Sequence, residues 1–149
     1  LFMGFEHALF DRLTREYEQD NLAGYALYTF SGSLTGIVFE PVVAVPAIFM
    51  LTLGDPVSGL LGSGELRTVK RPRVLAAMFL TCLGLAVASW ELLPESLPLV
   101  VGVTGAAAAT VADGVKPVVA GYVVDDNLTI PIVAAGAMAL AAELVVAGA

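Results

Sequence analysis

The chain has few charged residues and almost none of the residue types that build the usual sites of soluble enzymes. Charged residues make up 14% of its 149 positions, whereas an average soluble domain has about 25%. A single cysteine, Cys82, excludes an internal disulfide and a zinc site made of cysteines. No Ser-His-Asp arrangement, His-x-x-Glu-His pattern or paired-cysteine metal motif is present.

Basic residues are fewer than acidic ones. Seven Lys and Arg residues stand against fourteen Asp and Glu, which gives a formal net charge of −7. Proteins that bind nucleic acid need a basic surface to neutralise phosphates. The composition therefore excludes nucleic acid as a partner.

Long apolar runs dominate what is present, since 58% of the residues are hydrophobic. A helix that crosses a bilayer core needs about 20 residues, and the runs are apolar all round rather than on one face. We therefore predict an all-α fold, a polytopic transmembrane helix bundle of about five spans that forms one membrane domain over residues 1–149. The predicted spans are residues 21–39, 41–62, 74–93, 96–113 and 127–147.

The basic residues predict how this bundle sits in the cell membrane. With five spans, every Lys and Arg falls on one side, which the positive-inside tendency makes cytoplasmic. These residues are Arg12, Arg15, Arg67, Lys70, Arg71, Arg73 and Lys116. The same topology places Trp90 in the aromatic belt of the external interface. It also brings the aspartates of the chain to the cytoplasmic side, where nucleotides are.

The segment Leu53-Gly54-Asp55-Pro56-Val57-Ser58-Gly59 places one carboxylate in an otherwise uncharged run. An ionised group near membrane depth is costly, so Asp55 is a candidate functional residue. Pro56 removes a backbone donor and predicts a break or kink in the second span. Asp55 has the hard oxygen ligands that suit Mg²⁺. The alternative is a carboxylate that pairs with Lys or Arg for structural reasons.

Small and basic residues follow Asp55 and predict a phosphate site. Gly54, Ser58, Gly59 and Gly62 would let a phosphate approach backbone N–H groups, although small residues also allow close helix packing. The segment is not a P-loop, because no Gly-Lys-Ser/Thr follows. Lys70 would neutralise phosphate charge, or serve only as a topology signal or a contact for anionic lipid.

A second acidic segment, Asp125-Asp126-Asn127-Leu128-Thr129-Ile130-Pro131, opens the last apolar run. In the structural interpretation Asn127 caps the helix, and the acidic pair is favoured at its positive end. In the functional interpretation the two adjacent carboxylates repel each other, and a metal or another cation relieves the repulsion. Pro131 is compatible with a helix start.

These elements resemble the CTP-dependent polyprenol kinases, the dolichol kinase and phytol kinase group. That family has a Gly-Asp-Pro-like element, a basic loop and an acidic-Asn-Leu-Thr-x-Pro element. The matching segments here are residues 53–62, 70–73 and 125–131, and residues 15–18 resemble an Arg/Glu stretch of the family. A Lys-x-x-Glu-Gly element and the upstream spans of the family are not matched. We therefore expect an archaeal-type member that is incomplete at its N-terminus.

The resemblance implies an integral-membrane kinase that transfers the γ-phosphoryl group of CTP to a polyprenol or other isoprenoid alcohol. It implies catalytic roles for Asp55 and Asp126, and Mg²⁺ bound by Asp55, Asp125 and Asp126. The implied nucleotide and phosphate contacts are Gly54, Ser58, Gly59, Gly62, Lys70 and Asn127. A cytidylyltransferase that forms a CDP-lipid, a transporter and a non-enzymatic scaffold remain alternatives. The alcohol, the choice of CTP and the oligomeric state stay open at this point.

Overall fold

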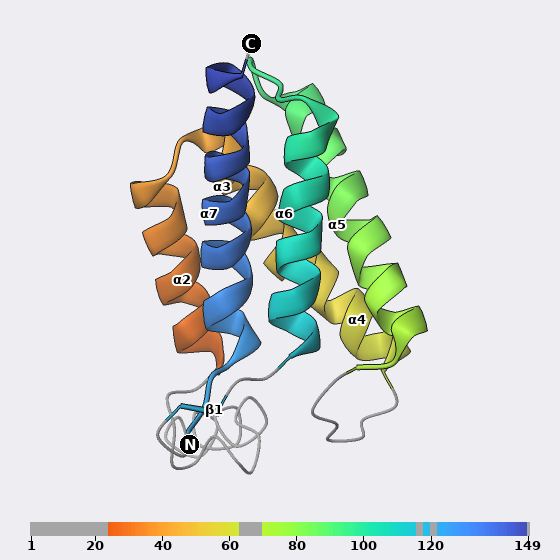
Figure 1. Ribbon diagram of the computed structural model, residues 1–149. Helices are drawn as coiled ribbons and strands as arrows, with labels where there is room; N and C mark the ends of the chain where they lie inside the picture. The colour runs from red at the N-terminus through yellow and green to blue at the C-terminus, as the bar shows by residue number, and fades with distance from the viewer. Residues whose placement is uncertain (1–23, 63–69, 116–117, 120–121, 149) are drawn as a thin grey trace.

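The computed structural model describes residues 24–62, 70–115, 118–119 and 122–148, and these form an all-α bundle, as predicted. Five helical segments run side by side (Figure 1). They are α2 (Gly24–Val38), a continuous segment of α3 (Pro41–Phe49), η2 (Met50–Gly54) and α4 (Asp55–Leu61), then α5 (Pro72–Leu92), α6 (Leu99–Gly114) and α7 (Asp126–Ala147). Two short strands, β1 (Val118–Val119) and β2 (Tyr122–Val123), pair antiparallel with Val118 opposite Val123.

Among the described residues, three helical segments are long and apolar enough to cross a membrane. These are Pro41–Leu61, Pro72–Leu92 and Asp126–Ala147. The apolar helix α6 has 16 residues, about 24 Å of helix, which is shorter than a hydrocarbon core of about 30 Å. The described part of α2 is similar in length, and residues 21–23 of the first predicted span lie outside the described residues. The fold is therefore that of a helical membrane protein.

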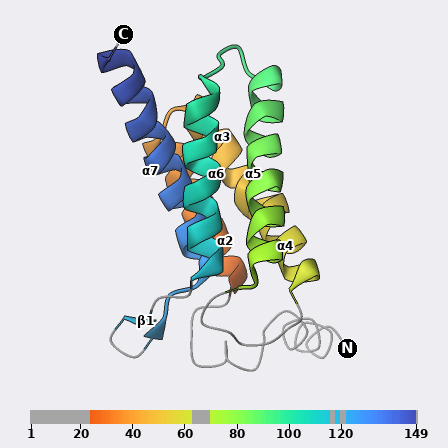
Figure 2. The ribbon, with the colours of Figure 1, turned by 45° about the vertical axis from the view of Figure 1, so that its right-hand side comes forward.

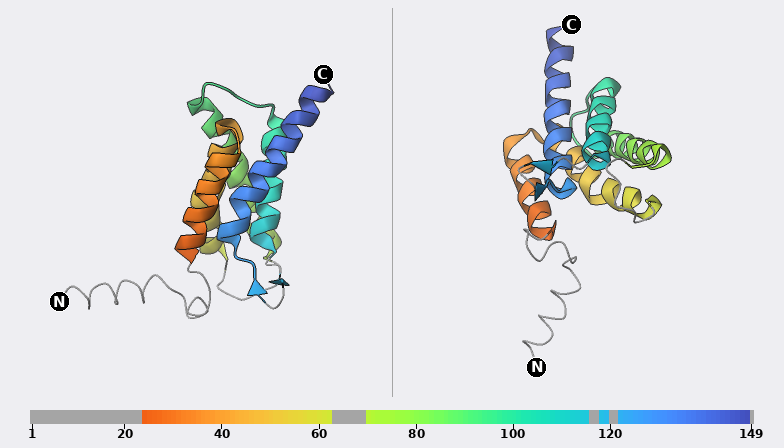
Figure 3. Two further views of the ribbon diagram at one scale, coloured as in Figure 1. Left: turned by 90° about the vertical axis from the view of Figure 1, so that its left-hand side faces the viewer. Right: turned by 60° about the horizontal axis from the view of Figure 1, so that its bottom comes forward.

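The five segments alternate in direction, and this places five helix ends together. In Figure 1, α2 rises, the α3–η2–α4 segment descends, α5 rises, α6 descends and α7 rises to the C-terminus. The start of α2, the end of α4, the start of α5, the end of α6 and the start of α7 therefore share one end of the bundle. The turned views in Figures 2 and 3 show the same grouping. We call this the lower end, and the opposite end the upper end.

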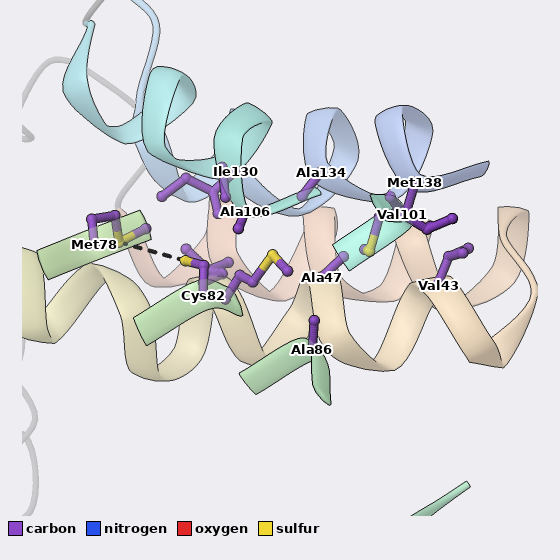
Figure 4. Packing of buried hydrophobic residues seen from close by; sticks show 14 of the residues in the cluster. Val43, Ala47, Met78, Cys82, Ala86, Val101, Ala106, Ile130, Ala134 and Met138 are labelled. Atoms are coloured by element: carbon purple, nitrogen blue, oxygen red, sulfur yellow. Dashed lines mark hydrogen bonds between the residues drawn. The ribbon is translucent and has the colours of Figure 1, made fainter. Parts of the chain in front are cut away.

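Small residues and methionines fill the core between the helices (Figure 4). Ala47, Ala106 and Ala134 are fully buried, and Met78 and Met138 belong to the same buried cluster. Small side chains let helices approach closely, as they do in membrane bundles. Unbranched methionine side chains adapt to the gaps that remain. This packing holds the helix ends at the lower end in fixed positions.

The chain does not break at Asp55-Pro56, but its helical hydrogen bonding is irregular there. The segment from Pro41 to Leu61 stays helical, and Gly54 and Asp55 have right-handed helical dihedrals. A π-helical turn, η2, precedes the proline instead. In such a turn the amide of residue i+5 bonds the carbonyl of residue i, so the hydrogen-bond register changes just before the residue that lacks an amide.

Trp90 lies in the last turn of α5, at the upper end, and its side chain packs inside the bundle. Its side chain is only 6% exposed, and its indole Nε1 donates to the carbonyl oxygen of Val42 at 2.9 Å. Pro46 lies four residues after Val42 inside α3 and has no amide to donate to that carbonyl. Trp90 therefore satisfies, from α5, a carbonyl that a proline leaves without its helical partner.

Candidate metal centre

Three aspartates meet inside the lower end of the bundle. Asp55 is the first residue of α4, Asp113 lies in the last turn of α6, and Asp126 is the first residue of α7. One carboxylate oxygen from each lies within 4.8 Å of the other two. Asp113 is fully buried, Asp126 is 7% exposed, and Asp55 is half-buried. The antiparallel order of the helices brings together residues that are far apart in the sequence.

The helix dipole acts in opposite ways on two of these carboxylates. Asp126 lies in the first turn of α7, where the helix dipole favours a carboxylate. Asp113 lies near the C-terminal end of α6, where the dipole disfavours one. A buried carboxylate in that position requires a direct cationic partner.

Lys70 supplies that partner. Its Nζ lies 2.5 Å from Oδ1 of Asp113 and also donates to Oγ of Ser58 at 2.9 Å. The Ser58 hydroxyl donates to Oδ2 of Asp113 at 2.7 Å, so both oxygens of this carboxylate accept hydrogen bonds. The Lys70 amide donates to the carbonyl oxygen of Gly114 at 3.3 Å, which anchors the lysine backbone beside the end of α6.

The net negative charge of these side chains favours a bound cation. The three carboxylates and the ammonium of Lys70 have a formal charge of −2 together. Carboxylates so close to one another repel when all are ionised, and a bound cation would relieve this repulsion. Carboxylate and hydroxyl oxygens are the ligands that Mg²⁺ and Mn²⁺ prefer. The residues present therefore fit a divalent cation of this kind.

Asp55 and Asp126, which the sequence nominated as ligands, lie together, whereas Asp125 has a different position. The cluster found among the described residues contains Asp113 in place of Asp125. Asp125 is the N-cap of α7, and its Oδ1 accepts from the amide of Asn127 at 2.9 Å and from its Nδ2 at 2.8 Å. The cap is therefore Asp125 and not Asn127. Consecutive residues at a helix start point in different directions, which separates the roles of the two aspartates.

The predicted phosphate contacts are only partly brought together. Ser58 and Lys70 are in direct contact beside the carboxylates. Gly59 is exposed, and a Cβ placed on it would meet nothing within 4 Å. Gly62 ends α4, and its amide donates to the carbonyl oxygen of Ser58 at 2.9 Å. Asn127 directs its side-chain amide to Asp125.

Gly54 is a packing residue. It is buried, and a Cβ at this position would lie 3.1 Å from Sγ of Cys82 and 3.2 Å from Sδ of Met78. The glycine thus allows η2 to approach α5 closely, and this approach fixes the height of Asp55 in the bundle.

Asp113 is the site residue that the sequence did not nominate as a ligand. The available signal was a single acidic residue at the end of the run over residues 96–113, on the side where the other aspartates were expected. Of the basic residues used for orientation, Lys70, Arg71 and Arg73 lie at the lower end, directly before or within the first turn of α5. Arg12, Arg15, Arg67 and Lys116 lie outside the described residues.

Comparisons of the chain with protein-family models, with curated proteins and with solved structures found no match.

Proposed function

We propose that the chain is an integral-membrane phosphotransferase that moves the γ-phosphoryl group of CTP to an isoprenoid alcohol with the help of Mg²⁺. The observation that carries the proposal is the buried cluster of Asp55, Asp113 and Asp126 at one end of an apolar bundle, in contact with Lys70 and Ser58. The elements around residues 53–62 and 125–131, which resemble polyprenol kinases, supply the choice of nucleotide and acceptor.

The three carboxylates would hold the metal, with Asp113 in the place that the sequence suggested for Asp125. Bound Mg²⁺ supplies neutralisation of the phosphate charge that develops during transfer. The other contributions come from the side chains. Lys70 has three N–H donors, two of which reach Asp113 and Ser58, so one is left for a phosphate oxygen. Because its side chain is 23% exposed, it can meet a nucleotide from the aqueous side.

Asp55 is the best placed of the three to act on the acceptor. It is half-buried, whereas Asp113 and Asp126 are buried. Its carboxylate would accept the proton of the alcohol hydroxyl as the alcohol oxygen bonds to the γ-phosphorus and the bond from that phosphorus to CDP breaks. The lipid tail would lie among the apolar helices, which expose large hydrophobic side chains such as Leu53 and Leu60 near this residue. Lys70, Arg71 and Arg73 at the same end favour a cytoplasmic active site in the cell membrane.

A product assay tests the proposal. The purified full chain in detergent is incubated with Mg²⁺, CTP labelled at the γ-phosphate and a panel of isoprenoid alcohols. We expect label in the lipid phase for the wild type, none for Asp55→Asn, and normal transfer for Glu91→Gln, which changes an exposed carboxylate at the upper end. A folded Asp55→Asn variant that remains active would contradict the role of Asp55.

Two other functions give different results in the same experiment. A cytidylyltransferase would release labelled pyrophosphate and leave CDP on the lipid. A transporter is suggested by one observation, the π-helical turn beside a carboxylate in an apolar helix, because interrupted helices form ion sites in transporters. Absence of nucleotide turnover with every alcohol, together with cation flux into liposomes, would replace the kinase proposal with that function.

A further inference from the structure

Pro131 removes a hydrogen bond from the helix that carries Asp126. It lies inside α7, in the second turn. In an α-helix the amide of residue i donates to the carbonyl of residue i−4. Proline has no amide, so the carbonyl of Asn127 loses its usual partner. Asn127 is the residue directly after Asp126.

Ser31 of α2 replaces the missing donor. Its Oγ donates to the carbonyl oxygen of Asn127 at 2.6 Å, and its side chain is fully buried. A second acceptor, the carbonyl oxygen of Tyr28, is farther away at 3.2 Å. A hydroxyl has one proton, so the shorter contact is the stronger hydrogen bond. The bond joins α2 to the first turn of α7.

Asn127 is therefore held on both sides. The Asp125 carboxylate accepts from its amide at 2.9 Å, and Ser31 donates to its carbonyl at 2.6 Å. The position of the Asp126 backbone, between Asp125 and Asn127, is fixed by these two bonds. A metal ligand needs such fixing, because residues outside the ligand shell typically alter metal affinity when they are removed.

We propose that Ser31 is a positioning residue, whose hydroxyl takes the place of the amide absent at Pro131 and so holds the Asp126 carboxylate against Asp55 and Asp113. The inference rests on the metal site of the proposed function. It does not depend on the nucleotide or on the acceptor alcohol.

The molecule contains a matched control for this arrangement. At the upper end, Pro46 leaves the Val42 carbonyl without an amide, and Trp90 of α5 donates to it at 2.9 Å. This bond has the same cause and joins two helices in the same way, but it lies away from the three aspartates. Loss of the Trp90 bond should affect the stability of the fold alone.

The experiment measures Mn²⁺ binding to the full chain in detergent by electron paramagnetic resonance, together with the midpoint of thermal unfolding. We expect Ser31→Ala to weaken Mn²⁺ binding about tenfold. Trp90→Phe should lower the unfolding midpoint and leave the affinity unchanged. In the Pro131→Ala background, where residue 131 again donates to Asn127, Ser31→Ala should have little further effect on affinity or midpoint.

Each other outcome has a distinct meaning. Wild-type affinity in Ser31→Ala, or an affinity loss of the same size in the Pro131→Ala background, would overturn the role of Ser31 while the metal site stands. Wild-type protein that binds no Mn²⁺, or binds it as well after Asp126→Asn, would overturn the metal site and the Ser31 proposal with it.

Discussion

Both ends of the bundle have acidic residues, but these residues are exposed at the upper end and largely buried at the lower end. At the upper end Glu40, Glu91, Glu95 and Glu143 are all exposed. At the lower end Asp113 and Asp126 are buried, and Asp55 is half-buried beside them. The upper end also has an apolar groove between α6 and α7, lined by residues such as Val100, Leu140 and Ala141.

Burial of a carboxylate costs free energy unless partners compensate for its lost hydration. The upper end avoids this cost by leaving its acids in contact with solvent. At the lower end two carboxylates are buried and a third is half-buried, all within a few ångströms of one another, and Lys70 beside them is only 23% exposed. Structural needs alone are met by the arrangement at the upper end. This contrast supports the proposal that the charged groups at the lower end have a function.

The largest difference in Mn²⁺ affinity is expected between two variants in which an amide replaces a carboxylate, Asp113→Asn and Asp125→Asn. Loss of a residue that only orients a metal ligand costs about 10–100-fold in metal affinity, so Asp113→Asn, which changes a ligand itself, should cost at least about 100-fold in Mn²⁺ affinity. Asp125→Asn should change it less than threefold, because asparagine is as good an N-cap as aspartate. Isothermal titration of both purified variants measures this. Equal losses in the two variants would restore Asp125 to the site and contradict the separation of roles.

Loss of the lysine should destabilise the lower end. Removal of one partner from a fully buried ion pair costs about 3–5 kcal/mol, and because Lys70 is 23% exposed we expect about 2 kcal/mol for Lys70→Met. In the double variant with Asp113→Asn the cost should be smaller than the sum of the two single changes, since no unpaired charge remains. Thermal unfolding in detergent gives these values. Additive costs would show that the pair is not coupled.

A smaller effect is expected where the lower end meets the core. Gly54→Ala places a methyl group about 3 Å from Cys82 and Met78, and such overpacking costs more than the helix propensity that alanine adds. We expect a net loss of about 1 kcal/mol. In a Cys82→Ala background the contact with the cysteine sulfur is gone and only Met78 remains close, so the loss should become smaller. Unfolding midpoints of the four proteins decide this, and an unchanged loss would contradict the packing role of Gly54.

The upper end should give the smallest effect. Glu91→Gln and Glu95→Gln together should change stability by less than about 0.5 kcal/mol, because both side chains are exposed. Mn²⁺ affinity should not change. A marked loss of affinity in this double variant would remove the distinction between the two ends.

The apolar runs predicted the helices well, because a helix that crosses a bilayer core needs about 20 apolar residues. The run over residues 74–93 became α5 (Pro72–Leu92), and the run over residues 127–147 became α7 (Asp126–Ala147). Details that depend on tertiary contacts could not be predicted. Nothing in the segment around Trp90 reveals the carbonyl of Val42, on another helix, to which its indole donates.

The site was predictable in part for the same reason. Asp55 interrupts an uncharged run and Asp126 belongs to a distinctive segment, so each could be nominated from its neighbours in the sequence. Asp113 becomes a site residue only when α6 lies beside α4 and α7, and no local pattern contains that information. Asp125 and Asp126 look equivalent in the sequence, and only the direction of each side chain separates the cap from the cluster.

The most direct test of the central claim is an anomalous difference map from crystals of the full chain grown with Mn²⁺. The account predicts a peak at the lower end within about 2.5 Å of carboxylate oxygens from Asp55, Asp113 and Asp126. A map without a peak there, or with one bound through Asp125, would contradict it.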